Sequence, residues 1–99
     1  MNLQPLDDVT ITEGLSKAPG WSRDGDQLVA RYKPGRPKVV RFYTAIAAAE
    51  DELDHHAEIT ILYGSLRLAV TTHAAANKIT ERDVALAQRV AGIAADQGI

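Results

Sequence analysis

The chain has 99 residues, about the commonest size for one domain, so we expect a single domain over residues 1–99. Its net charge of −2 argues against a nucleic-acid groove or an anionic membrane surface as partner. Because there is no cysteine, disulfides, thiolate zinc sites and cysteine nucleophiles are excluded. Neither a secretory leader nor an apolar run of ~20 residues stands out, so we expect a cytoplasmic protein without membrane contact.

The first third of the sequence predicts a short helix followed by a hairpin. Thr10 or Thr12 is expected to cap a helix to about Lys17, because Thr10 and Glu13 have the spacing of a capping box. A breaker follows at 18–20. Residues 21–32 then alternate around an Asp-Gly pair, which is typical of a hairpin.

A long helix is predicted from Lys38 to about Asp54. Pro37 suits its first turn, and apolar side chains recur at steps of three and four, which places them on one face: Val39, Phe42, Ile46, Ala49 and Leu53. The helix ends in acidic residues over 50–54, the wrong sign for the C-terminal end of a helix dipole. Such a conflict favours a functional site at this end, although a solvated acidic face is the simpler explanation.

A second hairpin is predicted over residues 58–72, with one apolar face on each strand. A tight turn at Gly64-Ser65 would pair Tyr63 with Leu66. That register brings His56 and His73 together near one end of the sheet.

The last helix is predicted to begin at a capping box of Thr80 and Asp83. Its expected buried stripe is Val84, Ala87, Val90, Ala91 and Ala94. The order helix, hairpin, helix, hairpin, helix indicates an α+β fold, with a four-stranded antiparallel sheet and helices packed on one face.

All three histidines of the chain, His55, His56 and His73, fall within one third of the sequence. Imidazole is the side chain whose resting pKa lies closest to neutral pH, which suits it to proton transfer in both directions. The sequence therefore predicts an acid–base site.

The spacing of these residues resembles the signature of pterin-4a-carbinolamine dehydratases. The matching positions are Asp51, His55-His56, Tyr63, Thr72-His73 and Thr80-Glu81-Arg82-Asp83. The resemblance is close over roughly residues 41 to 91. Two positions depart from the family pattern: Ala57 stands where proline is usual, and Ile59 where an aromatic is usual.

The resemblance implies the same α+β fold and a hydro-lyase that converts 4a-hydroxytetrahydropterin to the quinonoid dihydropterin without a cofactor or metal. It implies acid–base roles for His55 and His73, and substrate binding with a share in proton transfer for His56. Asp51, Asp54 and Thr72 are expected to contact the substrate or orient a histidine. A homodimer or homotetramer is also implied, and an aromatic amino acid hydroxylase is a candidate partner.

Each of these positions also has a simpler explanation. Asp51 can be a solvated helix end, Asp83 is more easily a helix cap, and Tyr63 and Trp21 suit packing. A zinc site formed by the three histidines is disfavoured, since adjacent histidines rarely converge on one ion.

Two other functions stay open. Relatives of this fold resemble a dimerisation cofactor for a transcription factor and assembly chaperones, so a non-catalytic protein-binding module is one alternative. A related enzyme with a shifted substrate is the other, because Ala57 and Ile59 would permit it. The three histidines favour the enzyme, since a module without chemistry would have no need of them.

Overall fold

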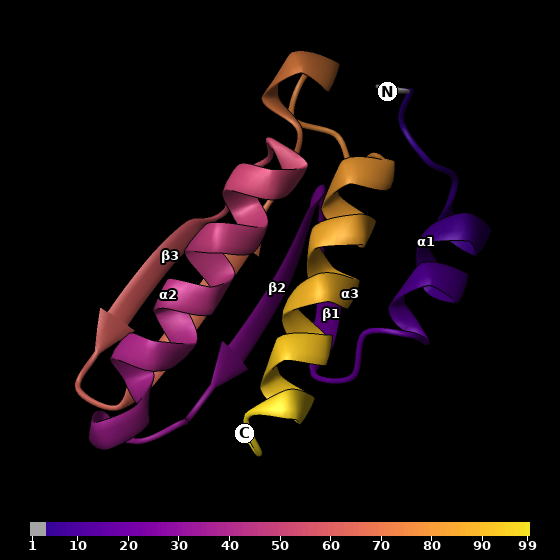
Figure 1. Ribbon diagram of the computed structural model, residues 1–99. Coiled ribbons are helices and arrows are strands. Elements are labelled where there is room, and N and C mark those ends of the chain that lie inside the picture. The colour runs from indigo at the N-terminus through magenta and orange to yellow at the C-terminus, as the bar shows by residue number, and fades with distance from the viewer. Residues whose placement is uncertain (1–3) are drawn as a thin grey trace.

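A computed structural model describes residues 4–99 and shows three helices packed against a four-stranded antiparallel sheet (Figure 1). The elements are α1 (Asp8–Leu15), β1 (Trp21–Asp24), β2 (Gln27–Tyr32), α2 (Arg36–Leu53), β3 (Glu58–Leu62), β4 (Ser65–Val70), the 3₁₀ turn η1 (His73–Ala75) and α3 (Glu81–Asp96). The predicted α+β class and the order of elements are confirmed. Among the described residues, no helix is both long and apolar enough to cross a membrane.

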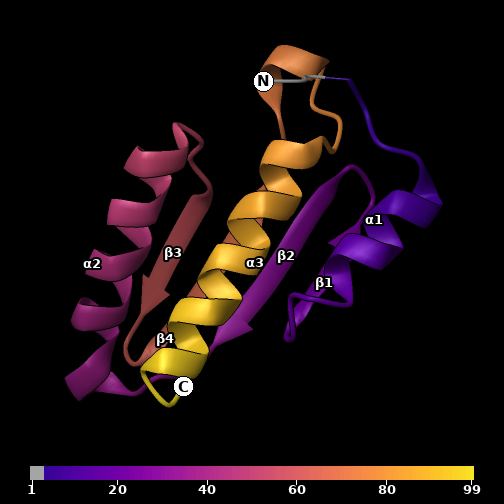
Figure 2. The ribbon, with the colours of Figure 1, turned by 45° about the vertical axis from the view of Figure 1, so that its right-hand side comes forward.

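The strand order is β1-β2-β4-β3, so β2 and β4 form the centre of the sheet and β3 lies at an edge. Helix α3 lies between α2 and α1 over one face of the sheet, and no helix of the described residues covers the other face (Figure 2). The core fills the space between the layers. Its largest fully buried side chains include Phe42 and Ile46 of α2, Leu28 of β2, Leu68 of β4 and Leu86 of α3.

Two expectations about the helices need correction. The N-cap of α1 is Asp7, whose side chain accepts a hydrogen bond from the Thr10 backbone N–H, and neither Thr10 nor Thr12 has this role. This start places Ile11 in the core. In α3, Val84 is only half-buried because it faces α1, and Leu86 packs in the core instead.

The apolar face predicted for β3 is only partly covered. Ile59 packs against the core, but Ile61 and Tyr63 are 42% and 82% exposed. As an edge strand, β3 has a neighbouring strand on one side only.

The register of the second hairpin also differs from the prediction. Leu62 pairs with Ser65, so the turn consists of Tyr63 and Gly64. Gly64 lies directly against the start of α2: a Cβ there would come within 2.7 Å of the Arg36 nitrogen, and the Gly64 carbonyl accepts a hydrogen bond from Gly35 N–H. Only glycine tolerates this approach, which fixes the turn one residue earlier than Gly64-Ser65.

Candidate active site

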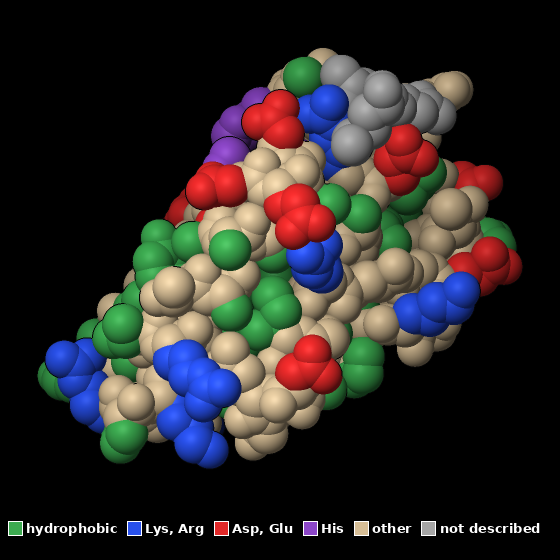
Figure 3. Space-filling model, in the orientation of Figure 1, with side chains coloured by type: hydrophobic (Ala, Val, Ile, Leu, Met, Phe, Trp, Pro, Cys, Tyr) green, Lys and Arg blue, Asp and Glu red, His purple; other side chains and the backbone are tan. Residues whose placement is uncertain are grey.

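The end of α2, the segment after β4 and the start of α3 converge at one end of the molecule, where Figure 3 shows histidine side chains beside acidic ones. A pocket of about 290 Å³ opens there. It is lined by residues from all three segments: Asp54, His55, His56, Thr71, Thr72, His73, Ala74 and Arg82. The three histidines predicted to share a site therefore surround one pocket.

The sharp end of α2 directs the histidine pair into this pocket. Asp54 is the C-cap and adopts the left-handed conformation (φ 51°, ψ 45°), which turns the chain out of the helix. The His55 backbone N–H then donates to the Glu50 carbonyl, and the Ala57 N–H donates to the Glu50 carboxylate at 2.7 Å. Glu50 is only 5% exposed. Its backbone carbonyl and its carboxylate thus hold the two sides of the His55-His56 step.

His55 is buried and bound to an acid from a distant part of the chain. Its Nε2 atom lies 2.7 Å from Oδ1 of Asp83, whose side chain is fully buried. Because a carboxylate only accepts hydrogen bonds, Nε2 carries the hydrogen, and in the neutral ring Nδ1 keeps the lone pair. This contact fixes the orientation of the imidazole.

The other oxygen of Asp83 ties the same acid to α3 and to the end of β4. Oδ2 accepts from the Thr80 backbone N–H at 2.8 Å and from the Thr72 hydroxyl at 2.7 Å. The hydroxyls of Thr72 and Thr80 lie 2.8 Å apart. The capping box predicted for Thr80 and Asp83 is present. Asp83 is thus both a helix cap and the partner of His55. The sequence favoured only the first of these two roles.

His56 faces solvent more than His55 does. Its side chain is 59% exposed, and Nε2 lies 3.1 Å from Oδ1 of Asp51. Asp51 does not line the pocket, so its contact with the site passes through His56. Asp54, by contrast, lines the pocket itself.

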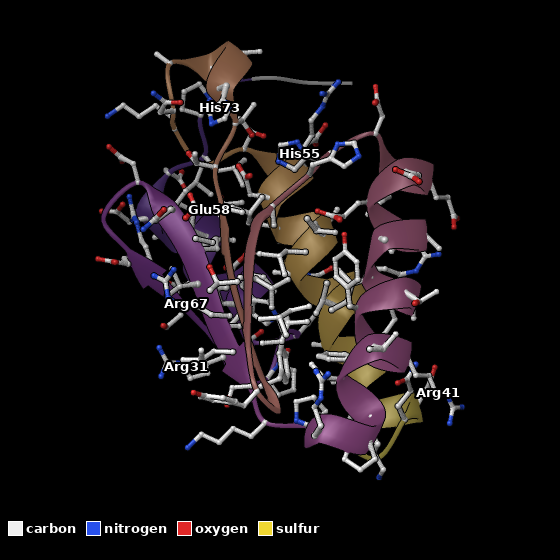
Figure 4. The ribbon with its side chains drawn as sticks, turned by 90° about the vertical axis from the view of Figure 1, so that its left-hand side faces the viewer. Arg31, Arg41, His55, Glu58, Arg67 and His73 are labelled. Carbon is white, nitrogen blue, oxygen red and sulfur yellow. The ribbon has the colours of Figure 1, made fainter. Side chains whose placement is uncertain are left out.

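His73 is the first residue of η1 and is exposed, and it lies on a different segment from His55 at the same end of the molecule (Figure 4). Within residues 4–99 its ring makes no hydrogen bond or ion pair. The hairpin register predicted to bring His73 here was wrong, because Leu62 pairs with Ser65 and, beyond β4, Thr72 forms a bridge with Lys78. The turn at η1 brings His73 to the pocket.

Two residues at the site received no role from the sequence. Glu50 was grouped with the acidic end of α2, and nothing in a single sequence separates a buried carboxylate from its exposed neighbours. Arg82 belongs to the Thr-Glu-Arg-Asp motif and lines the pocket, where it supplies a cation. In the described part of the chain, no group of three or more His, Asp or Glu side chains has the geometry to hold a metal ion.

Comparison with known proteins identifies a family for this chain. Residues 4–93 match the family described as Pterin 4 alpha carbinolamine dehydratase. A relative from Streptomyces coelicolor, provisionally named pterin-4-alpha-carbinolamine dehydratase, is 38% identical over 99% of this chain and 98% of its own length. A relative of the same name from Thermomicrobium roseum is 45% identical over 90% of this chain and 96% of its own.

A solved structure of a similar protein has the same fold. The crystal structure of a transcriptional coactivator/pterin dehydratase from Brucella melitensis superposes with a TM-score of 0.82 and 25% identity, covering 91% of this chain and 98% of that one. The family match over nearly all of the sequence and the shared fold lead to one conclusion: this chain belongs to the pterin-4a-carbinolamine dehydratase family.

Proposed function

We propose that the protein removes water from a 4a-hydroxytetrahydropterin to give the quinonoid dihydropterin, as part of tetrahydropterin recycling. In this reaction a base takes a ring N–H proton, and an acid protonates the 4a-hydroxyl as its C–O bond breaks. The observation that carries the proposal is the grouping of three imidazoles around one pocket, one of them hydrogen-bonded to a buried carboxylate. Such a set supplies both a base and an acid without a metal or cofactor.

The geometry supports a division of roles among the histidines. His55, held in position by Asp83, suits the proton acceptor, and His73, which lines the same pocket from η1, suits the complementary proton transfer. His56 is assigned to substrate binding with a share in proton transfer. Asp54 is placed to contact the substrate, and Asp51 to orient His56.

Thr72 is assigned a supporting role. Its hydroxyl donates to Asp83 and the residue is 2% exposed, so the hydroxyl already has a hydrogen-bond partner inside the protein. We therefore propose that Thr72 acts on the substrate through Asp83 and His55.

A stopped-flow assay that monitors the dehydration of a 4a-hydroxypterin by absorbance tests this function. His55→Ala and His73→Ala should each lower turnover by roughly 10²–10⁴-fold, the usual contribution of a general acid or base. Arg41→Gln is the control, because Arg41 is exposed on α2 and does not line the pocket. Wild-type rates in both histidine variants would overturn the proposal.

A second candidate is a protein-binding role. The Brucella melitensis protein is described as a transcriptional coactivator/pterin dehydratase. This description makes a protein-binding role a candidate beside the enzyme. Folded protein without any dehydratase activity toward 4a-hydroxypterins would favour this role over the enzyme. If the protein is the dehydratase, we propose an aromatic amino acid hydroxylase as the source of its substrate.

We also propose a homo-oligomer, either dimer or tetramer. Within residues 4–99, one side of β3 has no neighbouring strand, and Leu62 at the end of β3 is 63% exposed. An unpaired edge with apolar side chains is favourable for association with a second copy. Light scattering that gives the monomer mass at micromolar concentration would contradict this.

A further inference from the structure

Two arginines lie side by side on the sheet face that no helix covers. Arg31 of β2 and Arg67 of β4 are register partners, and Thr60 of β3 is the partner of Arg67 on its other side. The neighbouring positions Ala30 and Leu68 point into the core, so both arginines point outward. Figure 4 shows both side chains on the side of the sheet away from the helices.

Neither arginine has a counter-charge within residues 4–99. The ion pairs of the described residues involve other cations, and neither guanidinium donates a hydrogen bond there. Glu58 is a carboxylate on the same face, but it pairs with Ala69 and lies beyond ion-pair distance of Arg67. Like charges directly opposite each other on neighbouring strands destabilise a sheet. A local conflict of this kind is expected where the residues serve a function.

Two shallow pockets meet at this arginine pair. One has a volume of about 270 Å³ and is lined by Gly20, Ser22, Val29 and Ala30 together with both arginines. The other, of about 130 Å³, is lined by Thr60, Leu62 and Ser65 with the same two arginines. Both pockets therefore combine two guanidinium groups with hydroxyl donors, and no carboxylate lines either of them.

This chemistry matches a doubly charged oxyanion. A guanidinium group presents paired N–H donors that fit phosphate oxygens, and a phosphate monoester carries a charge of roughly −1.5 to −2 at neutral pH. Two arginines with β-carbons about 5 Å apart can both reach one such group. The volumes suit a small molecule, and the net charge of −2 opposes a nucleic acid or an anionic membrane.

We propose that the uncovered sheet face binds the phosphate monoester group of a small ligand through Arg31 and Arg67. This site is separate from the histidine pocket, with which it shares no lining residue. The hydroxyls of Ser22, Thr60 and Ser65 supply further donors. The proposal does not depend on the dehydratase activity.

Titrations followed by ¹H–¹⁵N NMR test the site, with sodium chloride at matched ionic strength as the reference. Inorganic phosphate and methyl phosphate should shift the amide signals of Arg31, Arg67, Thr60 and Ser65 with a millimolar dissociation constant. Dimethyl phosphate, a singly charged diester, should bind about tenfold more weakly, since one charge is lost.

Arg31→Gln and Arg67→Gln should each weaken phosphate binding by about tenfold, the effect of one charge-assisted contact. Arg67→Lys keeps the charge but loses the paired donors, and should weaken binding by less. The matched control is Arg41→Gln, because Arg41 is also exposed and its guanidinium makes no ion pair within residues 4–99, but it lies on α2, outside both pockets. Three results would each overturn the proposal. They are an unchanged phosphate affinity in Arg31→Gln and Arg67→Gln, equal affinities for the diester and the monoester, and an amide shift of Arg41 as large as those of Arg31 and Arg67.

Discussion

His55 and Asp83 are 28 positions apart in sequence, yet Nε2 of the first lies 2.7 Å from Oδ1 of the second, with both side chains buried. The same carboxylate closes the capping box of α3. The start of a helix and the orientation of a candidate catalytic imidazole are therefore set by one residue.

Replacement of Asp83 by Asn should separate these two roles. The amide removes the carboxylate that holds Nε2 of His55, so dehydratase turnover should fall by roughly 10²-fold while the helix cap is largely kept. Steady-state assays across pH check this, since a changed pH profile distinguishes an effect on His55 from a loss of folded protein. Asp51→Asn is the comparison: Asp51 is exposed and outside the pocket, and a loss as large as that of Asp83→Asn would contradict this assignment.

Replacement of Thr72 by Val should destabilise the fold. The change nearly preserves shape but removes a buried hydroxyl that donates to Asp83 and lies 2.8 Å from the Thr80 hydroxyl. A buried acceptor left without its donor costs about 1–3 kcal/mol in free energy of unfolding, measured by urea denaturation. Thr44→Val is the control, because Thr44 is exposed and bonds only to its own helix; equal stability losses in the two variants would rule out a special role for the buried network.

Two glycine substitutions should have opposite effects on stability. Gly64→Ala would place a Cβ 2.7–2.9 Å from backbone atoms of Gly35 and Arg36, and such overpacking costs about 1–3 kcal/mol. Gly92→Ala, in the exposed interior of α3 with nothing within 4 Å, should gain about 0.5–1 kcal/mol from helix propensity. Thermal and urea unfolding of the pair check this; a neutral Gly64→Ala would mean that the hairpin tip does not press against α2.

The cap of α1 should make a small part of the stability depend on pH. The Thr10 hydroxyl and backbone N–H hold the pKa of Asp7 below its usual value of 3.8. A carboxylate whose pKa is lower in the folded state stabilises the fold above its unfolded pKa, and this contribution disappears as pH falls through the lowered value.

Asp7→Asn retains a capping oxygen but does not titrate. The stability difference between wild type and this variant should therefore shrink below about pH 4 and stay constant above pH 5, as measured by urea unfolding at several pH values. Glu13→Gln, an exposed acid of the same helix, is the control. A difference that is constant from pH 2 to 6 would show that the charge of Asp7 does not stabilise the cap.

Several features were available from the sequence because they depend on neighbours along the chain. The period of apolar residues in α2, the breaker before it and the capping box at Thr80 and Asp83 are local patterns, and the structure confirms them. The grouping of the histidines was also predicted, although it rested on a hairpin register that the structure corrects.

What the tertiary structure alone decided is which side chains meet. The turn at Tyr63-Gly64 follows from the close approach of Gly64 to α2, and the edge position of β3 leaves Ile61 exposed. The burial of Glu50 and the contact of Asp83 with His55 arise only when α2, β4 and α3 pack together. A sequence records local propensity, whereas burial and long-range hydrogen bonds depend on distances that exist only once the layers have assembled.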